Sequence, residues 1–127
     1  MDYIINTMNG LLMHILLIVN AAAAAFGAVF SVVASFRPQI VPPHEDDRGP
    51  FLHAYAGRAV GLAVLAIPVL LHGVSPVAAL AALALGFGQA GDVAAFLRVG
   101  ARGMAAGASM GTLMHVASAV VIAVAIK

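Results

Sequence analysis

Three ionisable side chains lie inside long apolar stretches of this sequence, namely Arg58, Asp92 and His115. An arginine beside a carboxylate can keep that carboxylate ionised, or it can stabilise an oxyanion that forms on a bound ligand. A histidine can take up and release a proton near neutral pH. These residue types predict acid–base chemistry in which Asp92 or His115 moves a proton and Arg58 compensates the charge.

Each of these side chains has a polar neighbour one helical turn before it, which would share its face of a helix. The neighbours are Tyr55, Gln89 and Thr112. A further polar residue, Asn20, lies near the middle of the first apolar stretch. We expect these four side chains to orient a bound substrate. His115 also has Ser118 one turn after it, which favours a polar cavity wall.

The composition indicates a membrane protein. Of the 127 residues, 63% are hydrophobic and 9% are charged, whereas a soluble domain carries roughly 25% charged residues. The mean hydropathy is +1.06, so the chain is predicted to be an integral membrane protein surrounded by bilayer lipid. A net charge of +1 without a basic patch predicts no nucleic-acid partner, and the absence of cysteine excludes disulfides and thiolate chemistry.

Four stretches are long enough to cross a hydrocarbon core, which takes about 20 apolar residues. They are residues 10–36, 51–72, 76–97 and 103–126. All four should be helices, because backbone groups in lipid have no water to bond, and Ser75 should cap the third. Short links make neighbouring helices antiparallel. We therefore expect residues 1–127 to form one all-α domain, an integral membrane four-helix bundle with up-down-up-down topology.

Two of the links between these stretches are basic. Their arginines are Arg37, Arg48, Arg98 and Arg102. Cytoplasmic loops carry an excess of Lys and Arg, so both links are predicted to lie on the cytoplasmic side and both termini on the outer side. The membrane is predicted to be the cell (inner) membrane. Residues 1–10 contain no Lys or Arg, so we expect a retained span rather than a cleaved signal peptide.

Arg58 and Asp92 are expected to stand at the same depth. Arg58 lies seven residues after Phe51, which is about 10 Å into its span at the helical rise. Asp92 lies six residues before Arg98, which is about 9 Å from the same membrane face because its helix runs the other way. A lone charge at the bilayer centre costs on the order of 3 kcal/mol, so we predict that the two side chains pair.

Structural interpretations of the same residues stay open. The Arg58–Asp92 pair could be a staple that holds two helices in register without chemistry, and Arg58 is long enough to reach toward the membrane surface. His115 lies about 18 Å into its span, near the midplane, where it could simply hydrogen-bond a neighbouring helix.

Glycines recur at the spacing that lets membrane helices approach closely. Gly57 and Gly61 are four apart on the second span, and the fourth span repeats this spacing at 103, 107 and 111. Close backbone contact replaces the hydrophobic effect as the packing force in lipid. We expect these glycines to pack within one bundle, with formation of a homo-oligomer as the alternative.

No metal and no cofactor are expected. His14 and His72 could approach each other near the outer face, but no carboxylate completes a set of three or four ligands. The letters GFGQAG at 86–91 match a dinucleotide fingerprint, but they stand inside a predicted membrane helix with no preceding strand. The acidic run HEDDR at 44–48 is predicted to be a solvated link, with a lid over the bundle as the alternative.

Three motifs carry a family resemblance over about residues 37–118. They are YAGRAVGLA at 55–63, GDVAAFLRVG at 91–100 and TLMHVASA at 112–119. With the Pro-rich link before them, they resemble small four-span membrane proteins related to the DoxX-like superfamily. The residues that match are Arg58, Gly61, Asp92, Gly100 and His115. The resemblance implies a four-helix bundle and an association with membrane oxidoreductase complexes and quinones.

A weaker likeness, in FGAVFSVV at 26–33, is to small membrane proteins of the anthrone oxygenase type. That likeness implies oxygenation of an aromatic substrate without a metal.

The leading hypothesis is a small membrane enzyme that acts on a lipophilic small molecule entering from the bilayer. Isomerisation, cyclisation and cofactor-independent oxygenation all remain open as the reaction. One alternative is a non-catalytic accessory or scaffold subunit of a quinone-linked membrane complex, and another is a small proton-coupled carrier. A cavity separates the hypotheses, because an enzyme needs a pocket of a few hundred Å³ at the Arg58–Asp92 pair.

Overall fold

The computed structural model describes residues 2–41 and 49–126, and within these ranges the fold is helical. Its elements are α1 (Asp2–Phe36), the short 3₁₀ helix η1 (Pro38–Ile40), α2 (Gly49–His72), α3 (Pro76–Arg98) and α4 (Arg102–Ala125). Each of the four α-helices is long and apolar enough to cross a membrane. The predicted all-α integral membrane bundle is confirmed. Three helices match their predicted spans to within two residues, whereas α1 begins well before the predicted start at Gly10.

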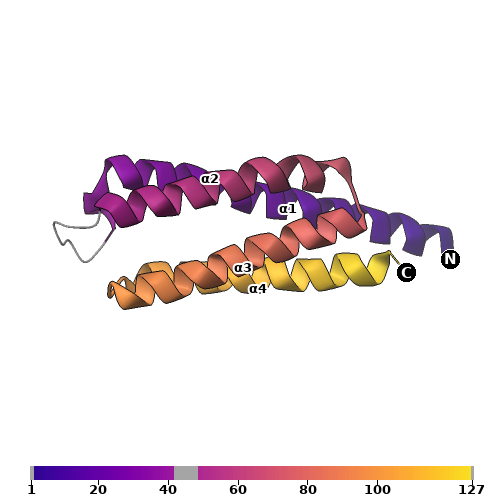
Figure 1. The fold of residues 1–127 in the computed structure, drawn as a ribbon. Coiled ribbons are helices and arrows are strands. Elements are labelled where there is room, and N and C mark those ends of the chain that lie inside the picture. Colours follow the sequence, from indigo (N-terminus) through magenta and orange to yellow (C-terminus); the bar gives the residue numbers. More distant parts are fainter. Residues whose placement is uncertain (1, 42–48, 127) are drawn as a thin grey trace.

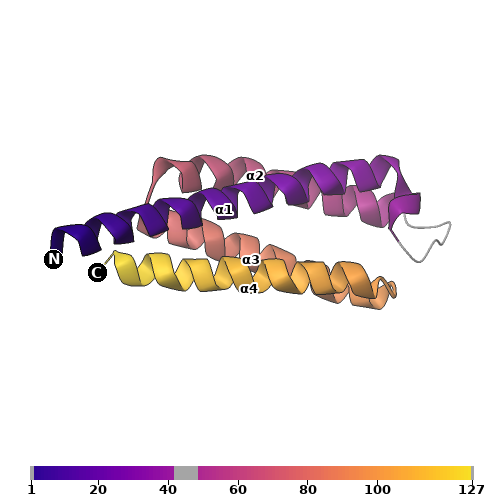
Figure 2. The same cartoon turned by 180° about the vertical axis from the view of Figure 1, so that it is seen from behind.

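The four helices run alternately up and down (Figure 1 and Figure 2). Both chain termini lie at one end of the bundle together with the turn at 73–75, and we call this the terminal end. The last residues of α1 and α3 and the first residues of α2 and α4 lie at the opposite end, which we call the loop end. Helices that are consecutive in the sequence are therefore antiparallel, as the short links predict.

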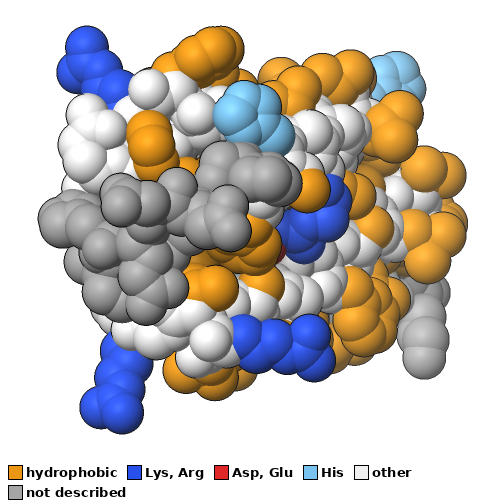
Figure 3. All heavy atoms as spheres, turned by 60° about the vertical axis from the view of Figure 1, so that its left-hand side comes forward, with side chains coloured by type: hydrophobic (Ala, Val, Ile, Leu, Met, Phe, Trp, Pro, Cys, Tyr) orange, Lys and Arg blue, Asp and Glu red, His pale blue; other side chains and the backbone are white. Residues whose placement is uncertain are grey.

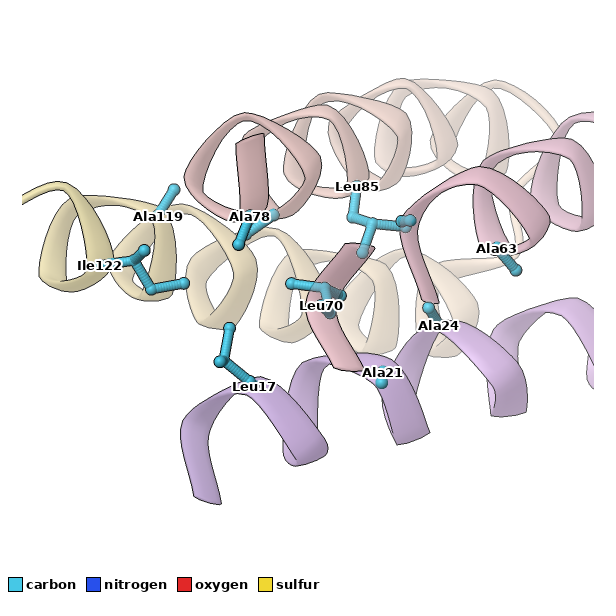
Figure 4. Packing of buried hydrophobic residues seen from close by; sticks show 11 residues of the cluster. Leu17, Ala21, Ala24, Ala63, Leu70, Ala78, Leu85, Ala119 and Ile122 are labelled. Carbon is cyan, nitrogen blue, oxygen red and sulfur yellow. The ribbon is translucent and has the colours of Figure 1, made fainter. Parts of the chain in front are cut away.

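The bundle is built from two helical hairpins. Contact is most extensive between α3 and α4 and between α1 and α2, while α2 meets α3, and α1 meets α4, less extensively. Figure 4 shows the main hydrophobic cluster, to which all four helices contribute. Leu17, Leu70, Leu85 and Ile122 are its larger members, and alanines make up most of the rest. Small side chains let the backbones approach, which is how helices associate in lipid.

The turn between the hairpins follows from local sequence. The Ser75 hydroxyl accepts a hydrogen bond from the backbone N–H of Ala78 at 3.1 Å, and Pro76 occupies the first turn of α3. This cap was predicted and is confirmed. Just before it, Gly73 has a φ of 124°, a conformation that residues with a side chain rarely adopt.

The surface of the bundle suits a bilayer. Large hydrophobic side chains face outward on every helix, including Phe26 and Leu65, each 74% exposed. Arg37, Arg98 and Arg102 are exposed at the loop end, and Figure 3 shows basic side chains beside hydrophobic ones on the face turned toward that end. Such a surface fits association with membrane lipid.

Gly86 packs closely, since a Cβ there would lie 2.8 Å from Val116 Cγ2, so α3 and α4 touch through bare backbone. Of the five glycines predicted above to pack within the bundle, Gly111 does so, because a Cβ there would lie 3.1 Å from Gln89 Cδ. At the other four an added Cβ would meet nothing within 4 Å. These are Gly57, Gly61, Gly103 and Gly107. These four glycines face outward, because their helices present other residues to the interior of the bundle. The prediction that they pack inside the bundle is therefore wrong. Homo-oligomerisation stays a prediction.

We expect Gly86→Ala to lower the melting temperature of the protein in detergent, whereas Gly107→Ala should leave it unchanged or raise it. Alanine stabilises a helix by about 1 kcal/mol relative to glycine. At Gly107 no steric cost opposes this stabilisation, because an added Cβ would meet nothing within 4 Å. At Gly86 it is opposed by overpacking, which typically costs about 1–3 kcal/mol. Thermal unfolding followed by circular dichroism measures both. A Gly86→Ala variant as stable as Gly107→Ala would contradict the close approach of α3 and α4.

Candidate functional site

The predicted pairing of Arg58 and Asp92 is confirmed. Arg58 Nη2 forms an ion pair with Asp92 Oδ1, and Arg58 Nη1 donates a hydrogen bond to the backbone carbonyl of Gly88. The Asp92 side chain is 8% exposed and that of Arg58 is 37% exposed. The pair therefore joins α2 to α3, and so one hairpin to the other, with its carboxylate buried and its guanidinium partly open to the outside.

The sequence of α3 makes room for the guanidinium. A Cβ at either Gly88 or Gly91 would lie 3.6 Å from Arg58 Nη1, so the arginine rests on a stretch of helix that has no side chains in its way. At Gly88 an added Cβ would also lie only 2.6 Å from Leu62 Cδ1. These two glycines allow Arg58 to reach a backbone carbonyl as well as the carboxylate.

A groove of about 330 Å³ lies directly at this pair, between α2 and α3. It is lined by Phe51, Ala54, Tyr55, Arg58, Gly91, Asp92 and Ala95. It is open to the outside of the bundle, on the surface that would face lipid. The groove is therefore reached from the side, between α2 and α3, rather than through the middle of the four helices.

Aromatic rings form one wall of the groove. The Tyr55 ring packs edge-on against the Phe96 ring, with centroids 5.3 Å apart. The Phe51 ring also packs edge-on against Phe96, at a centroid distance of 6.1 Å. Arg58 Cζ lies 5.7 Å from the centre of the Tyr55 ring, within the range of a cation–π contact. Because Phe96 is buried, it fixes the two rings that line the groove. The wall thus rests on a buried ring, and the polar pair stands at its edge.

The inner side of the pair is packed closely. The void there measures about 20 Å³, which is room for roughly one water molecule. Gln89 lines this void, and its amide lies against the bare backbone of α1 and α4. A Cβ added at Gly27 of α1 would be 3.7 Å from Gln89 Nε2, and a Cβ added at Gly111 of α4 would be 3.1 Å from Gln89 Cδ. A ligand of drug size can reach Arg58 and Asp92 from the outer groove, but not from within.

A second polar cluster joins α1 to α4. Asn20 Nδ2 donates to Ser118 Oγ and to the Leu16 carbonyl, at 2.8 Å each, and Ser118 Oγ donates to the Met114 carbonyl at 2.7 Å. This amide orientation leaves Asn20 Oδ1 as acceptor, so His115 Nδ1, 2.6 Å away, carries the hydrogen and donates. Asn20, His115 and Ser118 are at most 2% exposed. The cluster is a hydrogen-bonded joint between helices.

The predicted site residues thus separate into groups. Arg58, Asp92 and Tyr55 share the groove, while Gln89 lies on the inner side of the pair. Asn20 and His115 form the second cluster and do not line the groove. The Thr112 hydroxyl donates to the Ala108 carbonyl of its own helix at 3.0 Å. Their catalytic and binding roles stay predictions.

Sequence reasoning missed most of the apolar lining. On α2 the spacing of Phe51, Ala54 and Tyr55 relative to Arg58 is the one-turn pattern that places residues on one face, so this part could have been found. The contributions of Gly91 and Ala95 depend on how α3 is rotated about its own axis toward α2, and no pattern in the sequence indicates that rotation.

The remaining candidates lie elsewhere. His14 Nδ1 is 2.8 Å from the Gly10 carbonyl of its own helix, and His72 is exposed at the end of α2. Within the described residues no three His, Cys, Asp or Glu side chains gather where they could hold a metal. The run at 44–48, predicted to be a solvated link with a lid as the alternative, lies outside the described residues.

No protein-family model, no curated protein and no solved structure matches this chain. The resemblance to the DoxX-like superfamily therefore stays a prediction, and the function has to be argued from the residues of the groove itself.

We expect Asp92→Asn and Arg58→Gln each to destabilise the protein, and the double variant to lose less than the sum of the two. Either single change leaves one charge without its partner in the membrane, and the double change leaves none. The coupling free energy from this cycle should be about 1–3 kcal/mol, in the upper part of the range for residues in contact. Thermal unfolding in detergent measures it. Additive losses would mean that the ion pair does not hold α2 to α3.

Proposed function

We propose that this chain is a small membrane enzyme that binds a lipophilic molecule in the α2–α3 groove and moves a proton on it. The observation that carries the proposal is the groove of about 330 Å³ that reaches the Arg58–Asp92 pair from the lipid-facing side. A volume of this order lies at the lower end of small-molecule pockets. A lipophilic ligand could enter it directly from the bilayer.

In this proposal Asp92 is the general base. Arg58 holds the carboxylate ionised, and Asp92 Oδ2 takes a proton from the ligand atom that faces it. The negative charge that develops on a ligand oxygen is stabilised by the remaining N–H groups of Arg58. Returning the proton from Asp92 to a different ligand atom completes an isomerisation, so that no other reactant is consumed. His115 takes no part, because it lies in the Asn20 cluster.

We test the function by asking what the protein carries from the membrane. Wild type, Asp92→Asn and Ser109→Ala are purified in mild detergent, and extracted small molecules are identified by mass spectrometry. We expect a lipophilic species that is at least tenfold depleted in Asp92→Asn and retained in Ser109→Ala, whose hydroxyl bonds within its own helix. Incubation with wild type should convert that species to an isomer.

The double variant Arg58→Gln/Asp92→Asn is the control for lost stability, because it removes the groove chemistry without leaving a lone charge. Recovery of equal amounts of every species from all variants would refute a ligand at this groove.

A non-catalytic role is the second candidate, and one observation favours it. The Arg58–Asp92 pair and the Asn20–His115 contact both join one hairpin to the other, and the inner side of the ion pair is almost filled. This is the arrangement expected of a staple in an accessory subunit. A species that binds at the groove but is returned unchanged after incubation would favour this role over the enzyme.

We further propose that the loop end is cytoplasmic in the cell (inner) membrane, because exposed arginines gather there. The chain has no cysteine, so single cysteines report without background. We expect Val74→Cys, at the terminal end, to react with a membrane-impermeant maleimide in intact cells. Gln39→Cys, at the loop end, should react only after lysis. The reverse pattern would invert the orientation.

A further inference from the structure

The groove offers more than a place for an apolar molecule, because its polar groups restrict the head group that it can hold. Resting on the function proposed above, we propose that the ligand has an uncharged head group in which a hydrogen-bond acceptor stands beside a hydrogen-bond donor. A hydroxyl next to a carbonyl or ester oxygen is the simplest such group. The inference follows from the charge of the site, its unused hydrogen-bonding capacity and its size.

The charge of the site is already balanced. Arg58 and Asp92 form an ion pair, and among the described residues no other Lys, Arg, Asp or Glu lines the groove. An anionic head group would bring a third charge into a region that excludes water, where charges are costly. A fatty acid carboxylate or a lipid phosphate would also compete with Asp92 for the guanidinium. A neutral head group adds no such cost.

The hydrogen-bonding capacity is only partly used. A guanidinium has five N–H groups, and among the described residues those of Arg58 meet the Gly88 carbonyl and Asp92 Oδ1. Asp92 meets Arg58 through Oδ1, and its side chain is 8% exposed. An ionised carboxylate has about four acceptor sites, so that of Asp92 can accept further hydrogen bonds. The site therefore presents spare donors and a spare acceptor next to each other, and an acceptor–donor pair on the ligand satisfies both.

The dimensions of the groove suit a head group rather than a whole lipid. Its volume is about 330 Å³, and small-molecule pockets begin at about this size. Because the groove is open to the lipid-facing surface, the chains of a bound lipid can stay in the bilayer. The small residues Ala54, Gly91 and Ala95 leave space beside the polar pair, and the Tyr55 and Phe51 rings close one side.

Native mass spectrometry with defined lipids tests the inference. Purified protein in detergent is mixed with equal mole fractions of dioleoylglycerol, trioleoylglycerol or oleic acid. Dioleoylglycerol has ester oxygens and a hydroxyl, trioleoylglycerol has ester oxygens only, and oleic acid is an anion. We expect wild type to bind dioleoylglycerol about tenfold more than either of the others, and Arg58→Gln/Asp92→Asn to lose this preference.

The single variant Asp92→Asn gives the sharpest expectation. It keeps the shape of the side chain but leaves the charge of Arg58 unpaired, so the groove becomes cationic. The preference should then change from dioleoylglycerol to oleic acid. Leu80→Trp is the matched control, since Leu80 lines a separate apolar groove of about 540 Å³ between α3 and α4, and this variant should bind as wild type does.

The outcomes separate this inference from the function on which it rests. If wild type prefers oleic acid, or binds trioleoylglycerol as well as dioleoylglycerol, and this binding depends on Arg58, then the head-group inference fails. The groove then remains a lipid site. If no probe binds in a way that depends on Arg58 and Asp92, or if Leu80→Trp alone abolishes binding, then both the head group and the proposed groove are wrong.

Discussion

The ion pair between Arg58 and Asp92 is the interaction on which the rest of this structure depends. Two helical hairpins, each closely packed within itself, meet over smaller surfaces, and this pair bridges α2 and α3 where they meet. In lipid the hydrophobic effect does not drive helices together, so close packing and polar contacts have to hold them. Gly88 and Gly91 leave the surface of α3 bare beneath the guanidinium, so Arg58 lies against the backbone of this helix.

The same pair connects architecture with chemistry. Its inner side is almost filled, which suits a joint between helices, while its outer side borders a groove open to the bilayer. Asp92 meets Arg58 through Oδ1, and Arg58 is partly exposed at the edge of the groove. In the proposed function, this one structural contact also presents a base and a set of donors to a lipophilic molecule. The Asn20–His115–Ser118 cluster, by contrast, borders no described groove and is internal to the bundle.

Much of this arrangement could be predicted residue by residue. The helical rise and the lengths of the links placed Arg58 and Asp92 at one depth on adjacent antiparallel helices, and the structure joins them. The cap at Ser75 also followed from local chemistry. The separation of His115 from Asp92 could not be predicted, because two residues on neighbouring helices can share a region of the membrane and still face different partners. The partner of His115 is Asn20, 95 residues away along the chain.

The sequence by itself determined which segments are helices, how they alternate and how deep each polar residue lies, since these depend on length, rise and composition. Only the tertiary structure decided how each helix is rotated about its own axis. In a soluble bundle an apolar stripe would indicate that rotation, but lipid is as apolar as the protein interior, and these helices carry large hydrophobic side chains on their outer surface. For that reason the outward glycines, the lining of the groove and the Asn20–His115 contact emerged only once the four helices were packed together.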